Sequence, residues 1–86
     1  MNTVELLEQA LDLVKRLGYT IRQEWLDTSG GGACEIKGKK VLFLDLAEGP
    51  LDHLEQVLET LRREKETGSL PMSQPLRDLL KLRKAA

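Results

Sequence analysis

Residues 29–46 read SGGGACEIKGKKVLFLDL and hold the most strongly β-like part of the chain. The pattern predicts a strand over residues 33–37, a turn at Gly38 and an apolar strand over residues 41–46. Glycine at the turn allows a positive φ, and the lysines around it suit a solvated hairpin tip. The apolar strand is hydrophobic on both faces, which predicts that it lies between the other two strands or that something besides the helices covers one face.

The segment before this hairpin predicts a helix and then a strand. Residues 2–17 carry apolar side chains three and four positions apart, begin at a capping residue, Asn2, and stop before Gly18. Residues 19–26 alternate imperfectly between apolar and polar types, as a half-buried strand does. Residues 27–32 then break the alternation with small, turn-forming side chains, so we expect irregular structure there.

The segment after the hairpin predicts two more helices. A leucine-rich helix opens at Pro50, which suits the first helical position, and ends near Gly68. A short last helix is capped by Ser73 and runs to about Lys84. The order of elements is therefore α-β-β-β-α-α. It predicts an α+β domain with a three-stranded antiparallel meander, both long helices packed on one face, and the third helix closing the edge or the end of the core.

The size and composition of the chain favour one small globular domain over residues 1–86. Of its residues, 41% are apolar and 31% are charged, which is typical of a folded, helix-leaning protein. The lone cysteine cannot form an internal disulfide, and a core this small has little stability to spare. Burial of apolar surface against a partner, as in a homodimer, would supply more.

The charge balance and the hydropathy pattern bear on partners and location. The formal net charge is −1, which removes the overall attraction expected of a nucleic-acid-binding protein. The first residues, MNTVE, lack the basic and apolar regions of a secretory signal. No apolar stretch approaches the roughly 18 residues that a membrane-spanning helix needs. We therefore expect a cytoplasmic protein that binds neither membranes nor nucleic acid.

The glycine run is the feature that most suggests a ligand. Backbone amides at Gly30, Gly31 and Gly32 could approach an anion, because glycines permit the conformations that form amide nests. Known phosphate loops need more: a Walker loop has Gly-Lys-Ser/Thr leading into a helix, and a dinucleotide fingerprint lies at a strand-to-helix turn. Here the run joins strand to strand, which favours a structural connection over a site for a small ligand or anion. The basic side chains that could assist binding are Arg22, Lys37 and Lys39.

Cys34 and His53 are the candidate pair for nucleophilic catalysis. An imidazole beside the thiol could favour the thiolate. Nothing in the spacing shows that the two side chains meet, however, and a lone cysteine on a strand is more often a small buried hydrophobe. One histidine and one cysteine are also a poor inventory for a metal, even with Asp45, Asp52 or Glu55 nearby. The sequence therefore predicts no catalytic site, no metal site and no cofactor.

Two residues depart from their surroundings. Asp45 is a carboxylate inside an apolar strand, so it needs a partner. Arg22 or Lys37 across the sheet, a cap on the following helix, or solvent could satisfy it, and we keep Asp45 with Cys34 and the three glycines as candidate binding residues. Trp25 could be an exposed anchor at an interface, but burial in the core is the favoured interpretation.

The chain resembles a small family of uncharacterised bacterial proteins over nearly its whole length. The likeness rests on GYTIR at residues 18–22, GGGACEI at 30–36, GKKVLFLD at 38–45, the leucine helix, and the LPM and PLRDLL segments. Its most distinctive parts are residues 31–34 and 70–80, and the family implies no activity. A hairpin followed by a helix also looks faintly like the catalytic portion of small zinc metallopeptidases. The chain lacks their histidine pair, so that likeness supports neither metal binding nor proteolysis.

These features favour a non-enzymatic interaction or regulatory module, because the sequence places apolar residues on amphipathic surfaces and gathers no convergent polar residues. The partner would be another protein or a second copy of the chain. A dimer that buries the apolar face of residues 4–17, or the two-sided strand, would fit. The alternatives are a small-ligand or anion-binding domain that uses Gly30, Gly31 and Gly32 and, as the least favoured, an enzyme based on Cys34.

Overall fold

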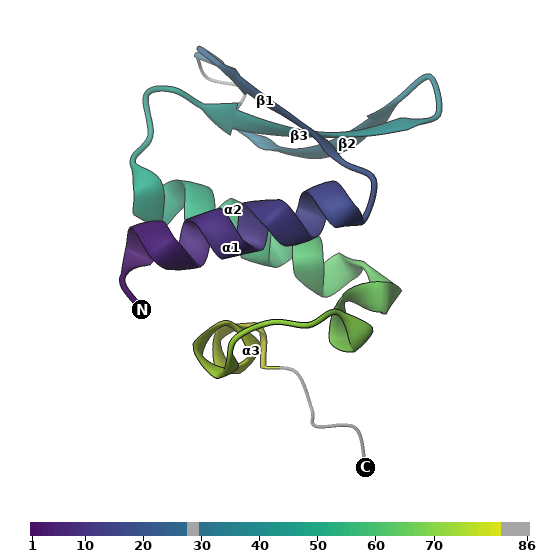
Figure 1. Ribbon diagram of the computed structural model, residues 1–86. Coiled ribbons are helices and arrows are strands. Elements are labelled where there is room, and N and C mark those ends of the chain that lie inside the picture. The colour runs from purple at the N-terminus through teal and green to yellow at the C-terminus, as the bar shows by residue number, and fades with distance from the viewer. Residues whose placement is uncertain (28–29, 82–86) are drawn as a thin grey trace.

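The helices and the sheet are stacked in layers. The computed structural model describes residues 1–27 and 30–81. Its elements in chain order are α1 (Thr3–Arg16), β1 (Thr20–Glu24), β2 (Gly32–Ile36), β3 (Lys39–Asp45), α2 (Pro50–Arg63), the 3-10 helix η1 (Lys65–Ser69) and α3 (Gln74–Leu80). Figure 1 shows α1 and α2 side by side against one face of the sheet, and α3 on the side of this helix pair that is remote from the sheet. The α+β class is confirmed.

The sheet is mixed and its strands are not in sequential order, so the prediction of an antiparallel meander is wrong. The strand order is β1-β3-β2, with β3 antiparallel to β2 and parallel to β1. The apolar strand is therefore central, as the first interpretation of its two hydrophobic faces predicted. The parallel pair follows from this central placement together with the directions of the connections. Because the chain reverses direction between β1 and β2 and again between β2 and β3, β1 and β3 run the same way.

The two faces of β3 lie in different environments. Leu42 and Leu44 are fully buried and belong to the core between the sheet and the helices. Val41 and Phe43 alternate with them and point to the opposite face, which no helix of the described residues covers (Figure 1). Val41 is nevertheless only 7% exposed, because a strand flanks it on each side. Apolar side chains thus lie on both faces of β3, but a helix layer covers only one.

The helices begin where the sequence predicts. Asn2 and Glu5 form a capping box: the Asn2 side chain accepts from the Glu5 N–H at 2.8 Å, and the Glu5 carboxylate accepts from the Asn2 N–H at 3.1 Å. Pro50 lies in the first turn of α2, and Ser73 caps α3. The Ser73 hydroxyl also donates to Gln9 Oε1 at 2.7 Å, which ties α3 to α1.

The last two helices are shorter than predicted. α2 ends at Arg63 and η1 follows it, in place of one continuous helix. α3 ends at Leu80, where Lys81 adopts the left-handed conformation with a φ of 56°; the predicted end near Lys84 lies outside the described residues. Leu76 and Leu80 belong to the core, so α3 closes the end of the core that is remote from the sheet. None of the helices within residues 1–27 and 30–81 is long and apolar enough to cross a membrane.

Trp25 lies outside the core, so the favoured interpretation of this residue is wrong. It directly follows β1 and is 72% exposed. Leucine, valine and alanine side chains from the helices and β3 make up the buried cluster instead. The tryptophan is therefore available to solvent at the end of an edge strand.

Candidate functional site

A hollow of about 270 Å³ opens between the start of β2 and one face of α2. On the β2 side it is lined by Gly31, Gly32 and Ala33. On the helix side the lining residues recur at spacings of three and four, so they share one face of α2. These residues are Gln56, Glu59, Thr60 and Arg63. The structure therefore brings two of the three predicted glycines to a cavity, whereas Gly30 does not line it.

The polar groups of this hollow mostly satisfy one another. Arg63 donates to the Glu59 carboxylate at 2.6 Å, and the two side chains are 67% and 63% exposed. The Thr60 hydroxyl donates to the carbonyl oxygen of Gln56 at 3.0 Å. The basic side chains predicted to assist an anion do not line the hollow: Arg22, Lys37 and Lys39. The guanidinium that does line it already has a carboxylate partner, which weakens the case for an anion site.

Gln56 marks the place where the glycine run presses against α2. Its Oε1 atom is buried and has no hydrogen-bond partner among the described residues, while its Nε2 atom lies 3.5 Å from a Glu48 carboxylate oxygen. An unpaired buried acceptor costs about 1–3 kcal/mol. This acceptor faces the main chain at Gly31. The unfavourable burial therefore occurs at the contact between the start of β2 and α2.

Gly31 is required by that close approach and not by an unusual backbone conformation. A Cβ atom at this position would lie 2.6 Å from the carbonyl oxygen of Phe43 and would also clash with Gln56 Oε1. The glutamine side chain can rotate away. The Phe43 carbonyl cannot move as easily, because it belongs to the backbone of the central strand. An alanine here would therefore push the start of β2 away from β3.

We expect Gly31→Ala to lower the free energy of unfolding by roughly 1–3 kcal/mol, as overpacking does. Gly68→Ala is the matched control, because a Cβ atom at Gly68 meets open space. It should be neutral or slightly stabilising, since alanine restricts the unfolded chain. Urea denaturation followed by circular dichroism measures both changes. Equal midpoints for the two variants would show that the contact at Gly31 does not constrain the fold.

Cys34 and His53 do not form a catalytic pair. Ala33 packs against the core, so the next residue, Cys34, points to the opposite face of the sheet, and it is exposed there. His53 lies on α2, on the helix side of the sheet, and its Nε2 donates to the main-chain oxygen of Asp45 at 2.6 Å. The expectation that Cys34 is a small buried hydrophobe is wrong, because its face of the sheet has no helix layer.

Asp45 has a structural role at the end of β3. Its side chain is nearly buried and accepts from the Ala47 N–H at 2.9 Å, which forms a turn that leads into α2. The cap of α2 is Gly49, which has no side chain to donate or accept, so Asp45 and His53 hold the entry to the helix instead. In the part of the chain that the structure describes, no group of three or more His, Cys, Asp and Glu side chains could hold a metal ion.

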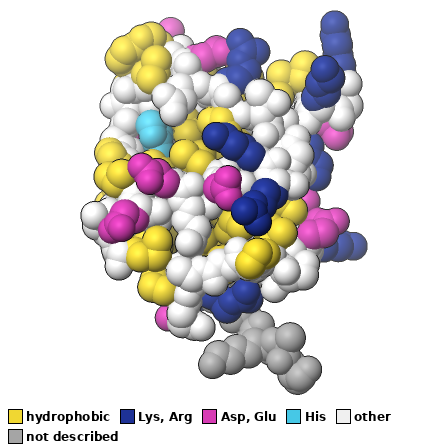
Figure 2. Space-filling model, viewed as in Figure 1, with side chains coloured by type: hydrophobic (Ala, Val, Ile, Leu, Met, Phe, Trp, Pro, Cys, Tyr) yellow, Lys and Arg dark blue, Asp and Glu magenta, His cyan; other side chains and the backbone are white. Residues whose placement is uncertain are grey.

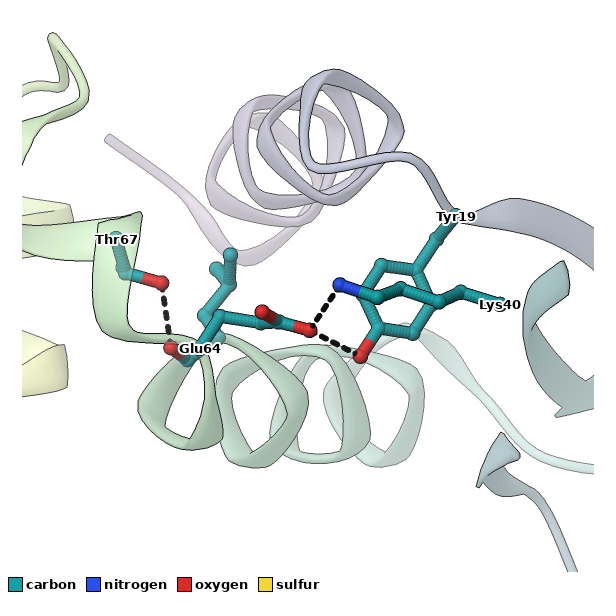
Figure 3. A network of polar contacts seen from close by, with 5 residues as sticks. Tyr19, Lys40, Glu64 and Thr67 are labelled. Atoms are coloured by element: carbon teal, nitrogen blue, oxygen red, sulfur yellow. Dashed lines mark hydrogen bonds and ion pairs between the residues drawn. The ribbon is translucent and has the colours of Figure 1, made fainter. Parts of the chain in front are cut away.

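A polar network that sequence reasoning missed joins three elements (Figure 3). The Tyr19 hydroxyl donates to Glu64 Oε1 at 2.7 Å, and Lys40 Nζ donates to the same oxygen at 2.9 Å. Lys40 Nζ also lies 5.4 Å from the centre of the Tyr19 ring. Tyr19 precedes β1, Lys40 lies in β3 and Glu64 follows α2, so the network fastens the sheet to the end of the helix. No local pattern marks these residues, because only the tertiary fold brings them together.

The pKa values of this network indicate a structural role. Hydrogen bonds from Lys40 and then from Tyr19 lower the pKa of the Glu64 carboxyl, and the bond to Glu64 raises the pKa of Lys40. Burial, and then the bond to Glu64, raises the pKa of Tyr19 to about 12. A catalytic acid or base needs a pKa near the working pH. All three groups move away from neutrality, as expected of partners that hold each other in place.

The hollow, the Asp45 turn and the Tyr19 network are three separate places, so the glycine run, Cys34 and Asp45 do not converge on one pocket. Comparison with known proteins adds no assignment, and the resemblance to an uncharacterised bacterial family stays a prediction. No family model, no curated protein and no solved structure matches the chain.

Proposed function

We propose that this domain is a non-enzymatic interaction module of the bacterial cytoplasm, and that it works by self-association through its sheet. The observation that carries the proposal is the one-sided covering of the sheet: α1 and α2 lie against one face, and the other face is open (Figure 1). Exposed apolar surface on a small protein commonly marks a protein–protein contact. The two edges of the sheet, β1 and β2, are open to further pairing as well.

The open face has the mixed character of an interface. Its accessible side chains are the half-buried Phe43, the exposed Cys34 and Ile36, which is 42% exposed, whereas Val41 between them is only 7% exposed. The Arg22 guanidinium lies over the Phe43 ring at 5.5 Å from its centre. Interfaces typically combine an apolar centre with a polar rim and are enriched in aromatic residues and arginine.

The helix surfaces give less support to association. The apolar stripe of α1 is already used inside the domain, with Ala10, Leu13 and Val14 buried. In Figure 2 the hydrophobic side chains on the visible helix surface are interrupted by acidic and basic ones. A dimer that buries residues 4–17 would therefore have to compete with the fold itself for most of that stripe.

Sedimentation velocity over a range of protein concentrations tests self-association, and hydrogen exchange at the lowest and highest concentrations locates it. We expect the mass to rise toward that of a dimer. Exchange should slow in the sheet but not in α1 and α3, because those two helices keep the same surroundings. A monomer at every concentration would overturn the proposal, and so would slowing confined to α1 and α3.

A second candidate function is the binding of a small polar ligand in the hollow beside Gly31 and Gly32. The observation in its favour is that these glycines share a cavity with the polar face of α2. A titration with inorganic phosphate, followed by the amide resonances of Gly30, Gly31 and Gly32, tests the anion-binding form of this candidate. Resonances that stay in place would remove it.

A further inference from the structure

We infer that two copies of this chain pair antiparallel through the free edges of their β2 strands, giving a six-stranded sheet with the two α2 helices packed side by side on one face. The inference rests on the proposed self-association and names its surface and its partner, a second copy. In the order β1-β3-β2, β2 is an edge strand with one side free. Such an edge is a template for pairing with another strand.

The turn before β3 fixes which backbone groups of β2 face outward. Its two residues, Lys37 and Gly38, have φ angles of 51° and 79°, as a type I′ turn requires. The hairpin closes with a hydrogen-bonded pair between Ile36 and the first residue of β3. Hydrogen-bonded and non-hydrogen-bonded pairs alternate along the ladder, so the backbone N–H and C=O groups of Ala33 and Glu35 point away from β3. The free edge therefore offers the N–H and C=O groups of these two residues.

These outward groups select one register of self-pairing. When Ala33 pairs with Glu35 of the second copy, and the reverse, every outward group of β2 gains a partner. A register centred on Glu35 would set two like charges directly opposite each other, and one centred on Ala33 would force Glu35 to pair with Gly31, outside the strand. The favoured register puts Cys34 on the two-fold axis in a non-hydrogen-bonded pair, with the two Cα atoms about 4.5 Å apart.

α2 runs along β2 in the same direction and over the same length. Gly31 lies against Gln56 near one end, and the Lys40 side chain, opposite Glu35, reaches Glu64 near the other. The four strand steps between these ends span about 13 Å, and the eight helical steps span about 12 Å. A level along β2 therefore corresponds to a definite level along α2, and Cys34, at the middle of β2, is level with about residue 62.

The lateral position of α2 suits contact with its copy. α2 contacts both β2 and β3, so it lies below the gap between them. Neighbouring strands are about 4.8 Å apart, and the two-fold axis lies midway between the two β2 strands. α2 is therefore about 5 Å from this axis, and the two α2 helices are about 10 Å from each other. Packed helices lie about 8–10 Å apart. Pairing of the β2 edges therefore brings the helices to packing distance.

The side of α2 that would meet the second copy carries complementary charges. With successive residues about 100° apart, Glu59 and Arg63 lie opposite the buried Leu54 and Leu61 and about a quarter turn from His53, which meets the end of β3. The midpoint of Glu59 and Arg63 is residue 61, which lies about 1.5 Å along the helix from the level of the axis. Antiparallel helices then set Glu59 against Arg63 of the second copy, twice by symmetry.

The native cysteine tests the register without any substitution. At a concentration where the wild type sediments as a dimer, oxidation with copper phenanthroline should convert most of the protein to a Cys34–Cys34 disulfide. Two thiols then lose two protons, and two electrons pass to the copper oxidant. The expected Cα separation lies within the range for a disulfide, about 4.4–6.8 Å. The cross-linked species should sediment as the native dimer does.

Charge exchange tests the helix contact. Glu59→Arg and Arg63→Glu, each alone, set like charges across the axis and should weaken dimerisation about tenfold. An equal mixture of the two variants should form a heterodimer with wild-type affinity, because each cross-axis pair is again opposite in sign. Asp12→Arg and Arg16→Glu are matched controls, since Asp12 and Arg16 form an exposed pair of the same spacing on α1. The controls should leave dimerisation unchanged, alone and mixed.

The outcomes separate this interface from the general proposal. Association without a Cys34 disulfide, and without recovery in the mixture, would overturn the β2 interface and leave self-association standing. A monomer at every concentration would remove both.

Discussion

Leu42→Ala is expected to cost about 3 kcal/mol of unfolding free energy, whereas Val41→Ala, one residue away, should cost about 1.5 kcal/mol. Leu42 is fully buried between the sheet and the helices, so its truncation leaves an enclosed cavity. Val41 is also buried, but it lies on the face without a helix layer, so its truncation removes fewer buried atoms and leaves a gap that solvent can reach. Small domains typically hold only about 5–15 kcal/mol in total, so the first substitution removes a large part of the stability.

Urea denaturation of both variants at low protein concentration measures this difference. The low concentration matters because association would add stability by mass action. If the two substitutions cost the same, the two faces of β3 would have equivalent surroundings and the open face would be covered in solution.

Glu64→Gln is expected to lower the titration midpoint of Tyr19 from about 12 to a value that stays above the ordinary 10.0. The substitution removes the charge of Glu64 and weakens its hydrogen bond with Tyr19, but it leaves the burial of the ring, the largest cause of the raised pKa. Tyr19 is the only tyrosine, so the near-ultraviolet absorbance of tyrosinate reports this residue alone. Glu59→Gln changes an exposed acid in another pair and should leave the midpoint unchanged.

The same network makes stability depend on pH at both extremes. Because the pKa of Tyr19 is raised, its contribution is fully present below pH 10.0 and is lost as the pH rises toward 12. Allowing for solvent screening, this loss is of order 1 kcal/mol. The raised pKa of Lys40 acts in the same direction, whereas Glu64, whose pKa is lowered from 4.5, contributes above that pH and loses its effect as the pH falls below it. A Tyr19 midpoint near 10 in the wild type would show that the network does not form.

The starts of the helices could be predicted because their signals are local. A cap at Asn2, a proline at position 50 and a cap at Ser73 each act within one turn, and each begins a helix in the structure. The pairing of the strands could not be read in the same way, since a strand pattern does not name its neighbour. The two apolar faces of residues 41–46 did indicate that this strand is central. Combined with two reversals of direction, a central third strand already implies a parallel partner.

The candidate site was predictable only in part. The glycine run marked one wall of the hollow, but the other wall, Gln56 to Arg63, has the sequence of a solvated helix face, and only the fold sets it beside β2. The role of Asp45 was not among the predicted ones, because its side chain accepts from the Ala47 N–H in the turn before α2, whereas the cap of α2 is Gly49. The prediction that Trp25 is buried was wrong, because leucine and valine side chains are enough to fill the core.

The two strand pairings of the mixed sheet differ in the entropy cost of closing the loop between their strands. A two-residue turn joins β2 to β3, whereas Thr20 of β1 meets Val41 of β3 across an intervening segment about ten times as long. Closure entropy grows with the logarithm of loop length, so the β1–β3 pairing costs roughly 2 kcal/mol more to close. The hairpin of β2 and β3 therefore forms from neighbouring residues at a low entropic cost, whereas the β1–β3 pairing has to be stabilised by the contacts that β1 makes in the complete fold.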